Sequence, residues 1–104
     1  MRVEVLYFEG CPHFEPTLES IEEVVDRLGV DAEIETIRVE DETQARRLGF
    51  LGSPSVRVDG DDIEPGADTE TKVGLGCRVY PTADGSSGIP PDVLIERALR
   101  SHRG

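Results

Sequence analysis

The chain has 104 residues, which suits one small domain, and its 28 Val, Ile, Leu and Phe residues allow a compact core. Its 22 acidic and 11 basic residues give a net charge of −11. This charge excludes an extended nucleic-acid-binding surface and disfavours binding to anionic membranes. Because no apolar stretch has the length of a membrane span or of a secretory signal, we expect a cytoplasmic protein without a membrane partner.

The first third of the chain predicts a strand, a helix and a second strand. Val3–Phe8 is a short β-rich run. Apolar residues then recur at helical spacing from Phe14 to Leu28, with acidic residues between them, and Gly29 ends this helix. Ala32–Val39 predicts the second strand, whose alternation slips once and so indicates a bulge.

The middle of the chain predicts a short helix and a hairpin. The helix covers roughly 42–48, between a capping box that starts at Asp41 and a terminating Gly49. Ser55–Asp59 is the third strand, and the Asp59-Gly60 pair is typical of a tight turn. Asp62–Glu64 then supplies a brief returning strand, with the acidic residues as a solubilising tip.

Residues 65–89 are rich in Gly, Pro, Asp, Ser and Thr, and Cys77–Tyr80 is the one segment among them with a strand-like pattern. Within this stretch, 85–88 reads as a flexible loop. Pro90-Pro91 opens a last helix. The order β-α-β-α-β-β-α predicts an α/β fold in which a four-stranded mixed sheet is flanked by helices.

The strongest candidate for chemistry is Cys11, which joins the first strand to the first helix. If Pro12 is the first helical residue, Cys11 is the N-cap, and the helix N–H groups favour its thiolate over the thiol. His13 adds positive charge when it is protonated. If the helix instead begins at Pro16, this argument is lost. The plain alternative is that Cys11 is a small buried apolar residue.

Cys11-Pro12 after the first strand, the element order, and Gly52-Ser53-Pro54-Ser55-Val56 before the third strand resemble the thioredoxin-like superfamily. The resemblance implies a single thioredoxin-like domain over 1–104, with 66–89 as an insertion before the last helix. It also implies a cis Ser53–Pro54 bond and a Pro54 that faces Cys11. The candidate catalytic residues are Cys11, Cys77, Pro54, Pro12 and His13.

Phe14 stands where the usual Cys-x-x-Cys motif of that superfamily has its second cysteine, so a local dithiol is excluded. We interpret Phe14 as a core anchor that leads the apolar stripe of the helix. The segments Y-F-E-G-C-P, G-S-P-S-V-R-V-D-G and G-L-G-C-R-V-Y are similar to a group of small bacterial thioredoxin-like proteins. Members of this group are sometimes labelled alkylmercury lyase.

The place of Cys77 depends on which segment pairs with the third strand. If Cys77–Tyr80 is that partner, Cys77 lies at the far end of the sheet, buried with Val79 on one strand face. If the Asp59-Gly60 hairpin returns at once through Ile63, the insertion begins at the Cys11 end and delivers Cys77 there. The hairpin signal favours the second arrangement.

Three function classes follow from these residues. The first is a thiol oxidoreductase in which Cys11 attacks a disulfide or peroxide and Cys77 or an external thiol resolves the adduct. The second is soft-metal or organomercurial handling by two thiolates, with the metal not specified. The third is a thioredoxin-like binding module without turnover. We expect no cofactor, and a thiol, disulfide or soft-metal compound or protein as the substrate.

Overall fold

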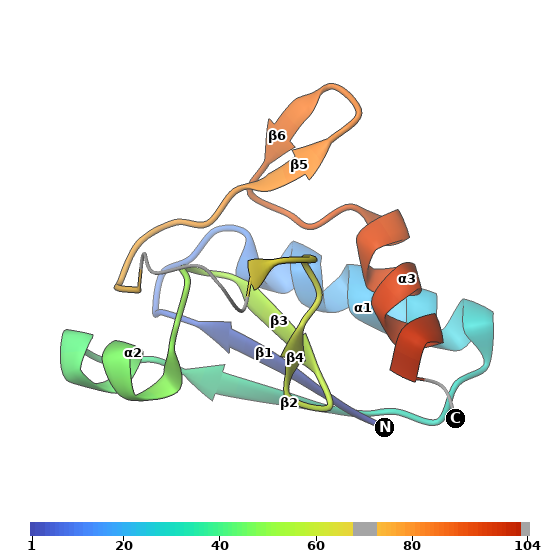
Figure 1. The fold of residues 1–104 in the computed structure, drawn as a ribbon, viewed down its shortest axis with the longest axis horizontal. Coiled ribbons are helices and arrows are strands. Elements are labelled where there is room, and N and C mark those ends of the chain that lie inside the picture. The colour runs from blue at the N-terminus through green and yellow to red at the C-terminus, as the bar shows by residue number, and fades with distance from the viewer. Residues whose placement is uncertain (68–72, 103–104) are drawn as a thin grey trace.

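The computed structural model describes residues 1–67 and 73–102 (Figure 1). Residues 68–72 of the predicted insertion therefore lie outside the described residues. The elements in chain order are β1 (Arg2–Tyr7), α1 (Phe14–Leu28), β2 (Glu33–Arg38), α2 (Glu42–Leu48), β3 (Ser55–Val58), β4 (Asp61–Asp62), β5 (Tyr80–Thr82), β6 (Gly85–Ser87) and α3 (Asp92–His102).

Four strands form a mixed sheet in the order β2-β1-β3-β4, which confirms the predicted sheet. β1 pairs with β2 in parallel and with β3 antiparallel, and β4 pairs antiparallel with β3. The β1–β2 register runs without interruption from Arg2–Glu33 to Tyr7–Arg38, so the predicted bulge is wrong. The apolar residues of β2 do not alternate strictly because β2 lies at the edge of the sheet. Within this strand only Ile34 and Ile37 are partly buried, and the other four residues are exposed.

Helices cover both faces of the sheet. α1 and α3 pack together over one face, and α2 lies against the other (Figure 1). The larger cluster joins the valines of β1 and β3 to apolar residues of both helices: Val3, Val5, Val56, Val58, Ile21, Val24, Leu94, Ile95 and Leu99. The smaller cluster under α2 consists of Leu6, Val39, Ala45 and Phe50.

The ends of α2 agree with the sequence prediction. Asp41 accepts a hydrogen bond from the Gln44 amide at 2.7 Å, and Gly49 ends the helix with φ of 64°. The guanidinium of Arg57 on β3 donates to the carbonyls of Leu48 and Gly49, which would otherwise lack partners at the helix end. The C-terminal end of the helix is thereby fixed to β3.

The tight hairpin at Asp59-Gly60 is confirmed, since both residues have positive φ, 49° and 90°. β4 begins directly after this turn at Asp61, earlier than predicted, and Ile63 donates to the carbonyl of Val56. β3 thus takes β4 as its partner, so the arrangement in which 77–80 pairs with β3 is wrong. The chain returns to the end of the sheet where β3 begins.

Part of the insertion is regular. Tyr80–Thr82 and Gly85–Ser87 form a two-stranded hairpin that projects from the body of the molecule (Figure 1). The prediction of a flexible loop at 85–88 is wrong for residues 85–87, because they pair with β5. In the described ranges, none of the helices combines the length and hydropathy of a membrane-spanning segment.

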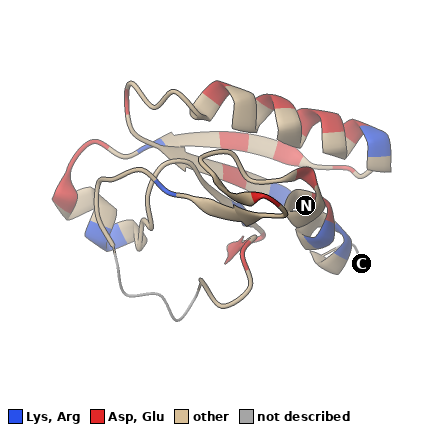
Figure 2. Cartoon of the chain, turned by 90° about the horizontal axis from the view of Figure 1, so that it is seen from above, with Lys and Arg blue, Asp and Glu red and all other residues tan. Residues whose placement is uncertain are grey.

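Acidic residues lie along the exposed side of α1, and basic residues lie toward the end of α3 (Figure 2). The α1 positions are Glu15, Glu19, Glu22, Glu23 and Asp26, all of them exposed. Their spacing leaves the opposite side of the helix to the buried residues Thr17, Ile21 and Val24. The negative charge of the chain is therefore a solvated surface feature here.

Candidate active site around Ser53 and Pro54

Cys11 is half-buried in the loop between β1 and α1. Its amide donates to the carbonyl of Phe8 at 3.3 Å, and its carbonyl accepts from the amide of Phe14 at 3.4 Å. The rings of Tyr7 and Phe14 stack with centroids 3.8 Å apart, which brings the two ends of the loop together. The loop is therefore fixed by contacts among near neighbours in the sequence.

The helix begins at Phe14 with His13 as its N-cap, between the two predicted starts. The first helical hydrogen bond runs from the Thr17 amide to the His13 carbonyl. It cannot form one residue earlier, because Pro16 has no N–H to donate to Pro12. Cys11 is therefore not the N-cap, and Pro12 is not the first helical residue. The premise that helix N–H groups surround the Cys11 thiol is wrong.

Pro12 and His13 differ in their surroundings. Pro12 is exposed on the turn that leads into α1. The ring of His13 lies against the backbone of Gly88, where a Cβ would stand 2.4 Å from its Cδ2 atom. The His13 side chain makes no capping hydrogen bond to the helix. The His13 ring thus contacts Gly88, at the end of the insertion.

The Gly52–Ser55 segment is buried and closely packed. The Ser53–Pro54 peptide bond is cis, which confirms the expectation from the resemblance. The Ser55 hydroxyl donates to the carbonyl of Gly52 at 2.6 Å. Gly52 has φ of 115°, and a Cβ on it would lie 3.0 Å from the Cβ of Arg78. This segment therefore requires glycine at position 52 for both its conformation and its close contact.

Cys77 lies beside this segment. Ser53 and Cys77 form an isolated parallel bridge, in which the Ser53 amide donates to Gly76 at 2.8 Å and the Arg78 amide donates to Ser53 at 3.0 Å. The hairpin arrangement thus delivers Cys77 to the end of the sheet that carries Pro54. Cys77 is exposed, and so is Val79, with 64% of its surface accessible. Burial of Cys77 and Val79 was predicted only for the arrangement in which 77–80 pairs with β3, and that arrangement is wrong.

Ser53 connects both cysteine-bearing segments. Its hydroxyl accepts a hydrogen bond from the amide of Phe8 at 3.4 Å, and Phe8 in turn accepts from the amide of Cys11. Its backbone binds the residues on either side of Cys77. Both thiols are free. The segments that carry the two cysteines, 66 positions apart in the sequence, therefore both bind one buried serine, the Cys11 side through its hydroxyl and the Cys77 side through its backbone.

No family model, curated protein or solved structure matches this chain.

A buried ionic cluster lies behind Cys77. The guanidinium of Arg78 makes two hydrogen bonds with Asp62, at 2.7 and 2.8 Å, one with Glu64 at 3.1 Å and one with the Ser55 hydroxyl at 3.1 Å. It also lies 4.5 Å above the ring of Tyr80. Burial acts to lower the pKa of Arg78, but the hydrogen bonds and charges of the two carboxylates outweigh it and raise that pKa.

Tyr80 completes the cluster. Its ring is fully buried, and its hydroxyl donates to the carbonyl of Pro54 at 2.5 Å. Burial raises the pKa of Tyr80 and outweighs the opposing charge of Arg78, and the carboxylates of Asp62 and Glu64 add to the rise. The phenol therefore stays protonated and can donate to Pro54 over the physiological pH range.

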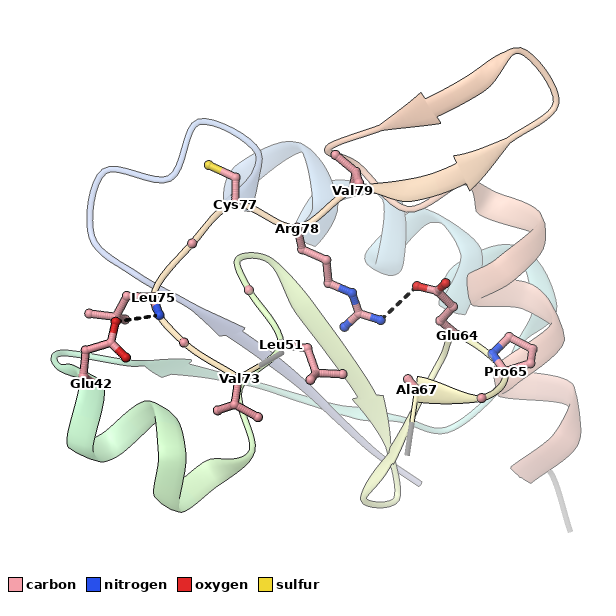
Figure 3. A pocket seen from close by; sticks show the side chains of 14 residues that line it. Glu42, Leu51, Glu64, Pro65, Ala67, Val73, Leu75, Cys77, Arg78 and Val79 are labelled. Carbon is pink, nitrogen blue, oxygen red and sulfur yellow. Dashed lines mark hydrogen bonds and ion pairs between the residues drawn. The ribbon is translucent and has the colours of Figure 1, made fainter. Parts of the chain in front are cut away.

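A pocket of about 560 Å³ lies between the 73–79 segment and the residues that follow β4. Figure 3 shows Arg78 extending toward Glu64, whereas Cys77 and Val79 project from the other side of their segment. Leu75 is tied to α2, because its amide donates to the Glu42 carboxylate at 3.2 Å. Within residues 1–67 and 73–102, no three His, Cys, Asp or Glu side chains are grouped to hold a metal ion.

Ser53, Arg78 and Tyr80 were absent from the predicted site. The alternation of Cys77-Arg78-Val79-Tyr80 was a signal for two of them, since it places Arg78 and Tyr80 on the same side of an extended segment. A buried arginine needs carboxylate partners. The alternating Asp62 and Glu64 meet that need, so they do not serve only as a solubilising hairpin tip.

Proposed function

We propose that this chain is a thioredoxin-like thiol oxidoreductase in which Cys11 attacks a disulfide and Cys77 resolves the adduct. The observation that carries the proposal is the double attachment of Ser53, to the Cys11 loop through Phe8 and to the Cys77 segment through its backbone. Two free thiols whose segments bind the same buried serine share one end of the sheet, and this proximity favours a reaction between them.

The proposed exchange balances without a cofactor. The Cys11 thiolate attacks one sulfur of a substrate disulfide, forms a mixed disulfide and releases the first substrate thiolate, which takes up a proton. The Cys77 thiolate then attacks the Cys11 sulfur and releases the second substrate thiol. The substrate is reduced to two thiols, and the protein is oxidised to a Cys11–Cys77 disulfide. An external dithiol restores the reduced protein.

The remaining candidate residues have supporting roles in this proposal. Pro54 is buried, its carbonyl is bound by Tyr80, and in this proposal its ring faces Cys11. Pro12 shapes the turn after Cys11. His13 supplies positive charge near the Cys11 loop when protonated, and its ring abuts Gly88 at the end of the insertion.

Trapping of the mixed disulfide tests the proposal. The reduced parent, Cys11→Ser and Cys77→Ser proteins are mixed with 2-hydroxyethyl disulfide, quenched in acid and analysed by intact mass, with the double serine variant as the control. We expect the parent to lose two hydrogens and carry no adduct, because the second thiol resolves the first. Cys77→Ser accumulates one adduct on Cys11, and Cys11→Ser reacts more slowly.

Stable adducts on both thiols of the parent, without an internal disulfide, would contradict the proposal. Soft-metal handling replaces it if the parent binds one equivalent of Hg(II) through both thiols and shows no disulfide exchange. Loss of that binding in either serine variant would identify the pair as the ligand set.

A further inference from the structure

Residues 76–80 contact every residue of the buried Gly52–Ser55 segment. The Ser53 backbone pairs with Gly76 and Arg78, and the carbonyl of Pro54 accepts from Tyr80. The Ser55 hydroxyl accepts from the guanidinium of Arg78. The Cβ position of Gly52 is closed by Arg78. The two segments therefore form one packed unit, and the β5–β6 hairpin continues from its last residue, the buried Tyr80.

Arg78 also attaches residues 76–80 to β4, at the edge of the main sheet. Only 7% of its surface is accessible, and its carboxylate partners come from β4 and the residue two positions beyond it. The paired oxygens of Asp62 fix the plane of the guanidinium, which a single contact would leave free to rotate. Its main chain is at the same time fixed to Ser53. Both ends of Arg78 are thus immobilised, directly beside Cys77.

We propose that Arg78 is the positioning residue of Cys77, and that its ionic contacts with Asp62 and Glu64 hold the neighbouring thiol at the Ser53–Pro54 segment. The effect of this positioning on reactivity rests on the proposed disulfide exchange. Arg78 does not touch the reacting sulfurs. It raises the effective concentration of the Cys77 thiol at the Cys11 mixed disulfide, because a fixed main chain has fewer positions to sample.

The first measurement is the effective concentration of the protein dithiol against glutathione, obtained from the oxidised fraction at equilibrium in buffers of fixed glutathione composition. For Arg78→Gln we expect a fall of about 10- to 100-fold. Arg78→Lys keeps the charge but not the paired geometry, so its value falls between those of the parent and the glutamine variant. The control Arg100→Gln loses an exposed ion pair with Glu96 and keeps the parent value.

The second measurement does not depend on redox chemistry. In a Cys11→Ser background, amide hydrogen exchange reports the hydrogen bonds made by the Ser53 and Arg78 amides. We expect Arg78→Gln to accelerate exchange at these two amides at least about tenfold, while the Val5 amide of β1 stays protected. Glu64→Gln keeps the contacts with Asp62 and gives a smaller acceleration, and it replaces Arg78→Gln if that variant does not fold.

The outcomes separate the two proposals. Unchanged exchange at Ser53 and Arg78 overturns the positioning role, whatever the redox result. Accelerated exchange in a protein whose parent forms no Cys11–Cys77 disulfide supports the positioning role and overturns the proposed function. Local loss of protection together with a lower effective concentration, partly restored by lysine at position 78, supports both.

Discussion

The Cys11 loop and the Cys77 segment meet at the same buried serine, but they are fixed by different kinds of contact. The Cys11 loop is closed by two turn hydrogen bonds and by the stacking of Tyr7 on Phe14, all within a few residues of the cysteine. The Cys77 segment is fixed by partners that are more than ten positions away, in the Gly52–Ser55 segment and in Asp62 and Glu64.

This difference predicts different responses to substitution. A locally closed loop keeps its shape as long as its own turn and the adjoining helix form. A segment fixed by distant partners loses its place when any of those partners is altered. The Cys77 side should therefore be the more sensitive of the two, and its loss should leave the Cys11 side in place.

The largest effect is expected from Gly52→Ala. The new Cβ meets Arg78 and the carbonyl of Gly76 at 3.0 to 3.2 Å, and φ of 115° strains any residue with a side chain. We expect the free energy of unfolding to fall by about 3 kcal/mol in urea titrations of the reduced protein.

The matched control for that variant is Gly29→Ala. Gly29 also has positive φ, 65°, but has no atom within 4 Å of its Cβ position. We expect Gly29→Ala to lower the free energy of unfolding by only about 1 kcal/mol, from backbone strain alone. Equal losses in the two variants would show that the 76–78 segment does not pack against Gly52.

A smaller effect is expected from Phe14→Cys, which alters the Cys11 side. The variant loses the stacked pair with Tyr7 and part of the packing of α1 against the core. Because Phe14 is only partly buried, we expect the free energy of unfolding to fall by about 2 kcal/mol, below the range for a fully buried phenylalanine. Urea titration under reducing conditions measures it.

Phe14→Leu is the control, since it keeps apolar bulk and should recover part of the loss. The Cys77 side should be unaffected, with the Arg78 amide as protected from exchange as in the parent. A Phe14→Cys variant as stable as the parent would show that the Tyr7–Phe14 stack does not fix the loop.

The smallest effect concerns His102, which ties α3 to the hairpin that carries Asp62. A hydrogen bond to Asp61 at 2.9 Å and one to the Ala98 carbonyl raise the pKa of His102 above its usual 6.5. The folded pKa exceeds the unfolded one, so this stabilisation is complete below about pH 6.5 and is lost as the pH rises through the folded pKa.

His102→Gln should therefore lower the free energy of unfolding at pH 6 but not at pH 9. The difference should stay below about 1 kcal/mol, because the Asp61 side chain is 75% exposed. Asp61→Asn should reduce the same pH dependence without removing it, because the Ala98 carbonyl and the charge of Asp59 still raise the pKa of His102. A larger loss of unfolding free energy at pH 9 than at pH 6 would contradict the predicted direction of this pH dependence.

The predicted elements that were confirmed depend on neighbouring residues. Asp41 and Gly49 bound α2, Gly29 ends α1, and Asp59-Gly60 makes the hairpin, because caps and tight turns are formed by residues a few positions apart. The start of α1 was wrong by two residues. Pro12 and Pro16 offered competing starts, and the helix takes neither: it begins at Phe14, because Pro16 has no N–H to donate to the carbonyl of Pro12.

The sequence by itself determined the strands of the main sheet, the three helices and their order, because periodicity and turn chemistry are local. It also placed Cys11 and Pro54 in loops at strand ends. It did not determine the β5–β6 hairpin, where a flexible loop was predicted at 85–88. Tertiary structure alone decided that Ser53 joins the two cysteine segments and that Arg78 is buried against Asp62 and Glu64. Such contacts form between residues far apart in the chain, where no spacing rule applies, and they exist only once β4 has returned the chain to the end of the sheet that carries Pro54.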